Sequence, residues 1–155
     1  GGLSVGEKKE PMLDMVKLLG KNMPIEQPRY LMGVGKPTDL VKAILRGVDM
    51  FDCVLPARNA RNGQIFTHDG VINITNSKYT HDTTPIDQHS SIEFATQFSK
   101  SYLRHLFKVN EMFGLRIATL TNIAYYFDLI KEIKNEINNN TFVKWSEEYL
   151  QNYDN

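Results

Sequence analysis

The sequence has little of what marks secreted, membrane-bound or strongly nucleic-acid-binding proteins. Its one cysteine, Cys53, cannot form an internal disulfide, which fits a reducing compartment, and we expect a cytoplasmic location. No run of about 18 apolar residues is present, and the N-terminus has no signal-peptide pattern, so no membrane partner is expected. Lys and Arg together number 18, as do Asp and Glu, so the formal net charge is zero. A nucleic acid would therefore have to bind a local basic patch.

The chain also lacks an initiator methionine and begins with the Gly-rich segment 1–6. Such a start is typical of the interior of a longer polypeptide, so we expect a truncated, cleaved or partially expressed chain. Removal of the methionine, or a tag scar, would produce the same pattern. The length of 155 residues suits about one domain. A composition of 41% hydrophobic and 23% charged residues is that of an ordinary globular protein.

The first third of the chain predicts alternating strands and helices. Apolar spacing and helix signals predict a helix over 11–19 ended by Gly20, a strand over 30–34, a helix capped by Thr38 or Asp39 and running to 46, and a strand over 48–55. This order is typical of a βαβ unit with a parallel sheet. Because both strand candidates are apolar runs, we expect them to be buried on both faces.

After Pro56 the pattern changes to a hairpin followed by helices. Asp69-Gly70 is a hairpin signal between the apolar segments 66–67 and 71–74. Segment 77–91 is polar and irregular. Apolar residues at spacings of three and four then predict helices over 91–113 and 121–138, and a short final helix that contains Phe142, Trp145 and Tyr149.

Asp52 is the first candidate for chemistry. It interrupts the apolar strand candidate over 48–55 towards its carboxyl end, and a carboxylate at the carboxyl end of a buried parallel strand is costly unless it is used or paired. In barrel enzymes, that end of the strands carries the catalytic groups. The residues leave two interpretations open: a catalytic carboxylate, or a structural one that caps the loop or pairs with Arg58 or Arg61.

Several motifs, in order and spacing, resemble those of bacterial tRNA-guanine transglycosylases. They are GGLSVGE at 1–7, RYLMGVGKP at 29–37 and GVDMFDCVLP at 47–56, followed by matches at 66–67, 76–79, 101–106 and 122–126. The resemblance covers essentially the whole chain. It implies an α/β fold: the C-terminal portion of a (β/α)8 TIM-type barrel with an inserted hairpin and helical subdomain. The implied divisions are the last barrel units at 1–62, the inserted subdomain at 63–118 and C-terminal helices at 119–155.

The resemblance also implies a reaction, the exchange of guanine at the tRNA wobble position for a 7-deazaguanine, preQ1 or queuine. Asp52 would be the nucleophile that forms a covalent tRNA intermediate. Gly2, Leu3 and Met32 would line the base pocket, although Met32 is equally suited to core packing. Arg58 and Arg61 would contact the tRNA, with a solvated loop as the alternative.

The chain departs from the family at the zinc site, which is C-x-C-x-x-C plus a later histidine. The ligand positions correspond to Ser90, Ile92, Ala95 and Thr121, none of which supplies a thiolate or imidazole. We therefore expect no zinc and no other cofactor. The remaining His81, His89 and His105, with Asp82 and Asp87, are interpreted as surface or helix residues rather than as an improvised metal site.

The resemblance places a second aspartate, the general acid/base, before Gly1. A nucleophile without that partner turns over slowly or not at all, so we expect the isolated chain to be inactive. An open partial barrel would also expose strand edges, so a homo-oligomer or a complementing N-terminal fragment is expected. Two alternatives remain: a catalytically inactive tRNA-binding or partner subunit, and a non-functional remnant of a split gene.

Overall fold

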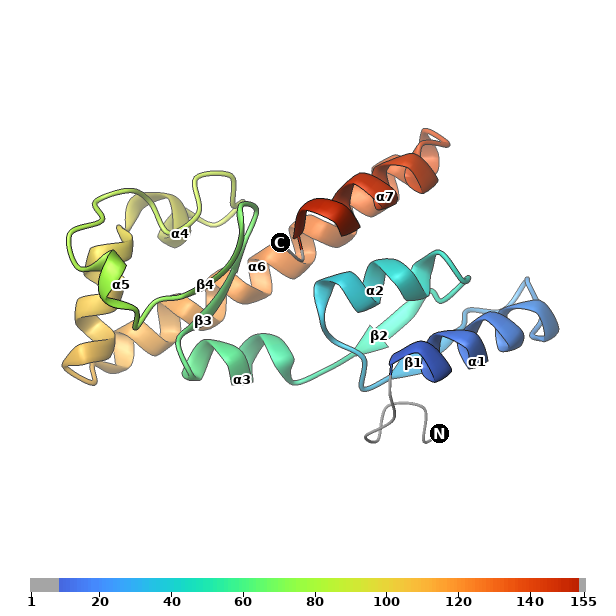
Figure 1. Cartoon of the computed structure of the whole chain (residues 1–155), viewed down its shortest axis with the longest axis horizontal. Helices are drawn as coiled ribbons and strands as arrows, with labels where there is room; N and C mark the ends of the chain where they lie inside the picture. Colours follow the sequence, from blue (N-terminus) through green and yellow to red (C-terminus); the bar gives the residue numbers. More distant parts are fainter. Residues whose placement is uncertain (1–8, 154–155) are drawn as a thin grey trace.

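A computed structural model of the chain describes residues 9–153 (Figure 1). The elements, in chain order, are α1 (Lys9–Asn22), β1 (Tyr30–Met32), α2 (Pro37–Ile44), β2 (Met50–Asp52), α3 (Leu55–Arg61), β3 (Gln64–Thr67), β4 (Gly70–Asn73), the 3-10 helix η1 (Ser77–Tyr79), α4 (Glu93–Gln97), α5 (Lys100–Lys108), α6 (Met112–Asn138) and α7 (Phe142–Tyr153). The architecture is α/β, as expected. No closed barrel is formed by residues 9–153.

Strands β1 and β2 pair in parallel and are connected by helix α2, which confirms the predicted βαβ unit. Helices α1 and α2 pack on one face of this sheet, where Leu31 is only 7% exposed within a cluster that includes Val16 and Ala43. On the other face Tyr30 and Met32 are 52% and 62% exposed. The expectation that both faces are buried is therefore wrong for the described residues, because the helices cover one face only.

The hairpin β3–β4 is antiparallel and turns at His68 and Asp69, as Asp69-Gly70 predicts. The helices that follow differ from the prediction. Instead of one helix over 91–113, α4 ends at Gln97, Phe98 is extended, and Ser99 caps α5 by accepting a hydrogen bond from the Tyr102 amide at 3.1 Å. Helix α6 then begins at Met112, well before the predicted start at Thr121.

Two local signals were also misassigned. Helix α1 continues through Gly20, where a side chain would collide with the carbonyl oxygen of Arg46, so close packing rather than helix termination calls for glycine there. The N-cap of α2 is Lys36 and not Thr38 or Asp39. Proline at position 37 starts that helix because its fixed φ suits the first helical turn.

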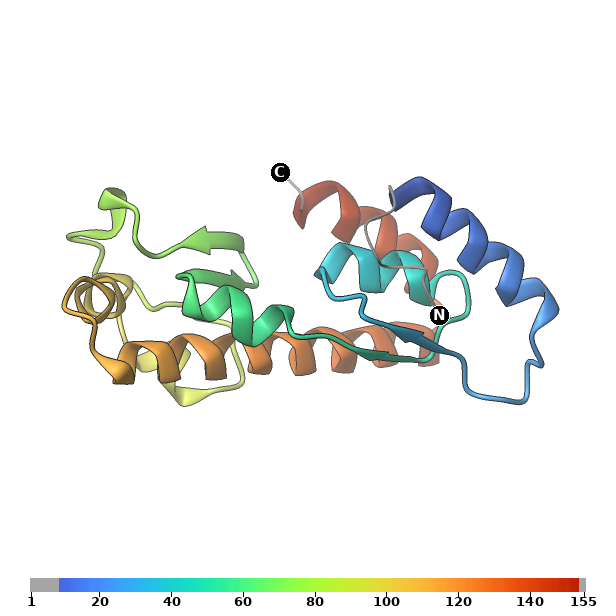
Figure 2. The ribbon, with the colours of Figure 1, turned by 90° about the horizontal axis from the view of Figure 1, so that it is seen from below.

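Helix α6 organises the molecule. It contains 27 residues, about 40 Å of helix, and runs along the length of the structure (Figures 1 and 2). The hairpin, α4 and α5 lie along its first half, and α2 and α7 lie beside its second half (Figure 1). Ile117 and Ala118 belong to the hydrophobic cluster under the hairpin, whereas Leu129 and Ile133 belong to the cluster shared with α2 and α7.

Asn122, in the middle of α6, is fully buried and connects three segments. Its side-chain oxygen accepts a hydrogen bond from the Phe66 amide at 2.9 Å. Its amide nitrogen donates to the carbonyls of Pro56 and Gln64, both at 3.0 Å. Asn122 therefore fixes α3 and β3 on α6, and so fixes the segment that follows Asp52.

A buried ion pair joins the hairpin turn to the following loop. His68 Nδ1 lies 2.7 Å from Oδ2 of Asp87, whose side chain is fully buried. The hydrogen bond to Asp87 raises the pKa of His68 above 6.5, and the negative charges of Asp128 and Glu132 also raise it. Burial lowers this pKa, but by less. Burial raises the pKa of Asp87, but hydrogen bonds from His68 and His89 outweigh it and hold this pKa below 3.8.

These shifts predict a pH dependence of stability. The raised pKa of His68 gives stability that is complete below about pH 6.5 and is lost as pH rises through the folded-state pKa. The lowered pKa of Asp87 gives stability that is lost only in acid. The free energy of unfolding should therefore fall as pH rises above about 6.5, and His68→Gln should flatten this slope. Urea titrations at several pH values would measure it, and an unchanged slope in His68→Gln would contradict the assignment.

Candidate active site

Asp52 is the last residue of β2 and is exposed at the carboxyl end of the parallel pair. Its Oδ1 accepts a hydrogen bond from the Tyr30 hydroxyl at 2.7 Å and a longer one from the Gly33 amide at 3.3 Å. Both donors bind the same oxygen, and Oδ2 accepts no hydrogen bond from residues 9–153. The carboxylate is thus held in place while one oxygen remains available for chemistry.

The two donors come from β1 and from the turn that follows it. The hydrogen bond to Asp52 raises the pKa of Tyr30, with burial and the nearby negative charge adding to it, so this hydroxyl stays protonated and donates. Gly33 has a φ of 75°, a left-handed conformation that glycine adopts without strain. This conformation aims its amide at Asp52, where it also bonds to the backbone carbonyl at 3.1 Å.

Met32 and Asp52 are partners in the sheet register and lie on the same exposed face. The structure therefore brings together the predicted nucleophile and the predicted apolar wall of the base pocket. Core packing of Met32, the alternative interpretation, is wrong for the described residues, because this side chain is 62% exposed. Gly2 and Leu3, the other expected pocket residues, lie outside the described residues.

Arg58 and Arg61 lie on α3, which begins three residues after Asp52. The alternative interpretation of a solvated loop here is wrong: Pro56 lies in the first turn of a helix, a position that proline favours. Both arginine side chains are exposed and, three residues apart, they share one side of the helix. Within residues 9–153, neither forms an ion pair with Asp52. The interpretation of Asp52 as the partner of Arg58 or Arg61 is therefore wrong.

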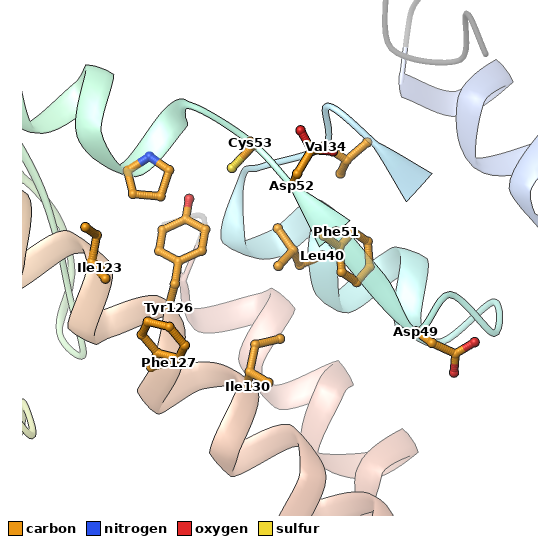
Figure 3. Close-up of a pocket in the computed structure, with 11 residues that line it drawn as sticks. Val34, Leu40, Asp49, Phe51, Asp52, Cys53, Ile123, Tyr126, Phe127 and Ile130 are labelled. Carbon is orange, nitrogen blue, oxygen red and sulfur yellow. The ribbon is translucent and has the colours of Figure 1, made fainter. Parts of the chain in front are cut away.

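An apolar cavity of about 410 Å³ lies beside Asp52, between β2 and α6 (Figure 3). The cavity is lined by Phe51 and Asp52 of β2 and by Cys53, which follows this strand. It therefore runs along the edge of β2 that faces away from β1, which no strand pairs with among the described residues. On α6, Tyr126 donates a hydrogen bond to the carbonyl of Gly35, and burial raises its pKa. Phe127, 72% exposed, forms the outer wall. These mostly apolar walls suit packing of further protein rather than a polar purine.

Sequence reasoning missed Tyr30 and Gly33. The only local signal for Tyr30 was its spacing from Met32, since residues two apart in a strand lie on the same face. Placing that face against Asp52 required the register of β1 on β2, which no local pattern contains.

The four expected metal positions do not fit a zinc ion. Ala95 and Thr121 are fully buried, and the Thr121 hydroxyl has no hydrogen-bond partner within the described part of the chain. None of the four side chains offers a thiolate or imidazole, and no group of three or more potential ligands occurs in residues 9–153.

His81, His89 and His105 are exposed, as expected, but Asp87 is buried and the expectation of a surface residue was wrong. Its burial is explained by three hydrogen bonds from His68 and His89.

No helix in residues 9–153 combines the length and apolar character needed to span a membrane.

Known proteins agree with the resemblance. The family model described as Queuine tRNA-ribosyltransferase matches residues 1–155. A queuine tRNA-ribosyltransferase of Francisella tularensis subsp. novicida is 51% identical over 153 residues, and one of subsp. mediasiatica is 50% identical. Each match covers 99% of this chain and 42% of the relative, so the chain spans about two fifths of the length of these relatives.

Proposed function

Because the chain belongs to the queuine tRNA-ribosyltransferase family, we propose that it contributes the nucleophile to a tRNA-guanine transglycosylase that exchanges guanine for a 7-deazaguanine. The observation that carries this proposal is the geometry of Asp52. Its Oδ1 is held by Tyr30 and Gly33, and its Oδ2 is left for attack at the carboxyl end of a parallel strand.

The proposed reaction consists of two displacements at the ribose C1′. In the first, an electron pair on Oδ2 of Asp52 forms a bond to C1′ while the bond between C1′ and guanine breaks. The electrons leave with guanine, which takes a proton from an acid outside residues 9–153. In the second, a ring nitrogen of the incoming base forms a bond to C1′ while the bond between C1′ and Oδ2 breaks and releases the carboxylate. The proton of that ring nitrogen passes to the conjugate base that the acid became in the first step. Two inversions retain the stereochemistry.

The remaining site residues take supporting roles in this proposal. Met32, with Gly2 and Leu3, contacts the base, and the exposed arginines Arg58 and Arg61 bind phosphates of the tRNA backbone. Extrusion of the target nucleotide brings C1′ to Asp52. The partners of the chain are thus tRNA and a 7-deazaguanine base, and a cytoplasmic location suits both.

The proposed site is completed by a complementing N-terminal portion that closes a (β/α)8 barrel. The outer edge of β2 has no strand partner among residues 9–153, and this edge and the cavity along it support the proposal, since the edges of parallel strands are normally paired or covered. Pairing with a second copy of the chain is the other way to cover this edge. We propose that the proton donor lies outside residues 9–153 and that the isolated chain is therefore inactive. The division into 1–62, 63–118 and 119–155 stays a proposal that the hydrophobic clusters match only in part. One cluster lies within 1–62 and another lies mainly within 63–118, whereas the third joins Val41 and Phe66 to residues of α6, which itself crosses the last boundary.

The replaced zinc positions favour a second candidate function, a non-catalytic tRNA-binding or partner subunit, or a remnant of a split gene. A chimera distinguishes these possibilities. This chain would replace the matching part of the Francisella tularensis subsp. novicida relative, and incorporation of labelled guanine into tRNA would be measured. Exchange by the chimera supports the proposed function. Binding of tRNA without exchange supports the binding subunit, and neither activity supports a remnant.

Tyr30→Phe should slow base exchange by the chimera about tenfold, the effect of losing one hydrogen bond to a charged group. Without the hydroxyl, Asp52 retains only the longer bond from Gly33 and samples unproductive orientations. Single-turnover rates of guanine exchange would measure this effect. Tyr79→Phe, a change on η1 far along the chain, is the control. Equal rates for the chimera and its Tyr30→Phe form would exclude a positioning role.

A further inference from the structure

The segment that carries three of the former zinc positions is folded by its own backbone. The Ala95 amide donates to the carbonyl of Ile92 at 3.1 Å, and the Asp87 amide donates to the carbonyl of Ala95 at 3.0 Å. The Ile92 amide reaches the Ser90 hydroxyl at 3.4 Å. These bonds close the 87–95 segment into a compact loop that needs no ion to hold its shape.

The same loop is fastened to the hairpin through Asp87. One carboxylate oxygen, Oδ2, accepts hydrogen bonds from both the backbone amide and the Nδ1 of His68, at 3.0 and 2.7 Å. The other, Oδ1, accepts from the His89 amide at 3.0 Å. A fully buried carboxylate with three donors is well compensated, whereas one that loses its donors is strongly destabilising.

The loop is also fastened to α6, the helix that carries the fourth former zinc position, Thr121. The Ser91 amide donates to Oδ2 of Asp128 at 3.0 Å. The His68 ring packs edge-to-face on Tyr125, with ring centroids 5.5 Å apart. Tyr125 lies one turn after Thr121 on the same side of α6. The loop and α6, the two segments that a zinc ion would join, are therefore joined by these contacts.

We infer that His68, Asp87, Ser91 and Asp128 form a metal-free cross-link, here called the Asp87 clamp, which takes over the structural role of zinc in the inserted subdomain. The clamp joins the hairpin, the 87–95 loop and α6 through hydrogen bonds instead of metal–ligand bonds. The subdomain accordingly folds without metal, and its stability depends on Asp87. This inference concerns folding and stands whether or not the proposed transferase activity is found.

The first test measures metal and thermal stability on the 155-residue chain itself. Washed protein should contain no stoichiometric zinc by elemental analysis, and neither EDTA nor added Zn²⁺ should move its Tm. Stoichiometric zinc, or a lower Tm in EDTA, would overturn the inference.

The second test removes the clamp. Asp87→Asn should lower the Tm by about 5–10 °C, since breaking a buried pair is strongly destabilising. Asp69→Asn, an exposed position in the same hairpin turn, should leave the Tm nearly unchanged. If Asp87→Asn does not fold, His68→Gln takes its place in the test. This variant keeps the carboxylate and its hydrogen bond from His89, and its Tm should fall by a few degrees. A Tm for these variants equal to that of Asp69→Asn would overturn the inference.

A rescue experiment tests whether the clamp replaces a metal. In the Asp87→Asn background, or in His68→Gln if the former does not fold, the four changes Ser90→Cys, Ile92→Cys, Ala95→Cys and Thr121→His restore thiolate and imidazole ligands. This variant should bind one zinc and regain the lost Tm only when zinc is present. Failure to bind zinc, or recovery without it, would show that the four positions do not form a metal site that the clamp replaces.

Discussion

Replacing Asp52 with asparagine should abolish the covalent tRNA adduct and lower the exchange rate of the chimera by about 10⁴-fold or more, the usual loss when a nucleophile is removed. An asparagine oxygen can still accept the hydrogen bonds from Tyr30 and Gly33, so the local structure is kept. The neutral amide, however, has no anionic oxygen to attack C1′. The adduct would be measured on denaturing gels after incubation with tRNA in the absence of a free base.

Asp49→Asn provides the matched control. Asp49 lies just before β2, and its carboxylate accepts a hydrogen bond from the Arg29 amide at 2.8 Å, which asparagine can also do. This variant should form the adduct at a rate close to that of the unmodified chimera. An adduct of equal yield in Asp52→Asn and in Asp49→Asn would mean that another residue is the nucleophile.

The second large effect is on stability. Asn122→Ala should lower the free energy of unfolding by roughly 2–4 kcal/mol, because one buried and two partly buried backbone groups lose their hydrogen-bond partner. They are the Phe66 amide and the carbonyls of Pro56 and Gln64. Urea titration of the 155-residue chain, followed by circular dichroism, would measure the change.

Asn135→Ala, at an exposed position on the same helix, is the control for altered helix propensity. Its effect should remain within about 0.5 kcal/mol. A loss in Asn122→Ala no larger than this would show that the three bonds do not hold α3 and β3 on α6. The proposed site would then lack its anchor.

The sequence predicted those elements whose signals are local. Alternating strands and helices, the Asp69-Gly70 turn and the final helix follow from spacing and turn chemistry, and the structure has them. The break at Phe98 and Ser99 was not predictable from apolar spacing, because Phe98, Tyr102 and Leu106 continue one helical stripe across it. The break is fixed by the Ser99 cap and by a bridge from Ser99 to Pro85, fourteen residues earlier.

The site shows the same difference between features with local signals and features that depend on long-range contacts. Asp52 and Met32 were selected as candidates because strand ends and family motifs are visible in the sequence itself. Tyr30 was not, because its role depends on the pairing of two strands separated by a helix. Asp87 was assigned to the surface because its partner His68 is 19 residues away. A contact of this kind exists only once the hairpin and the loop are folded against each other.

Helix α6 has a consequence for how the chain unfolds. Its first half contributes to the cluster under the hairpin and its second half to the cluster with α2 and α7. Neither cluster can melt without exposing apolar residues of the same continuous helix. The amide hydrogens around Asn122 to Leu129 should therefore be the slowest to exchange with deuterium, with opening free energies equal to that of global unfolding. In this way a single helix makes the hairpin cluster and the cluster with α2 and α7 one cooperative unit.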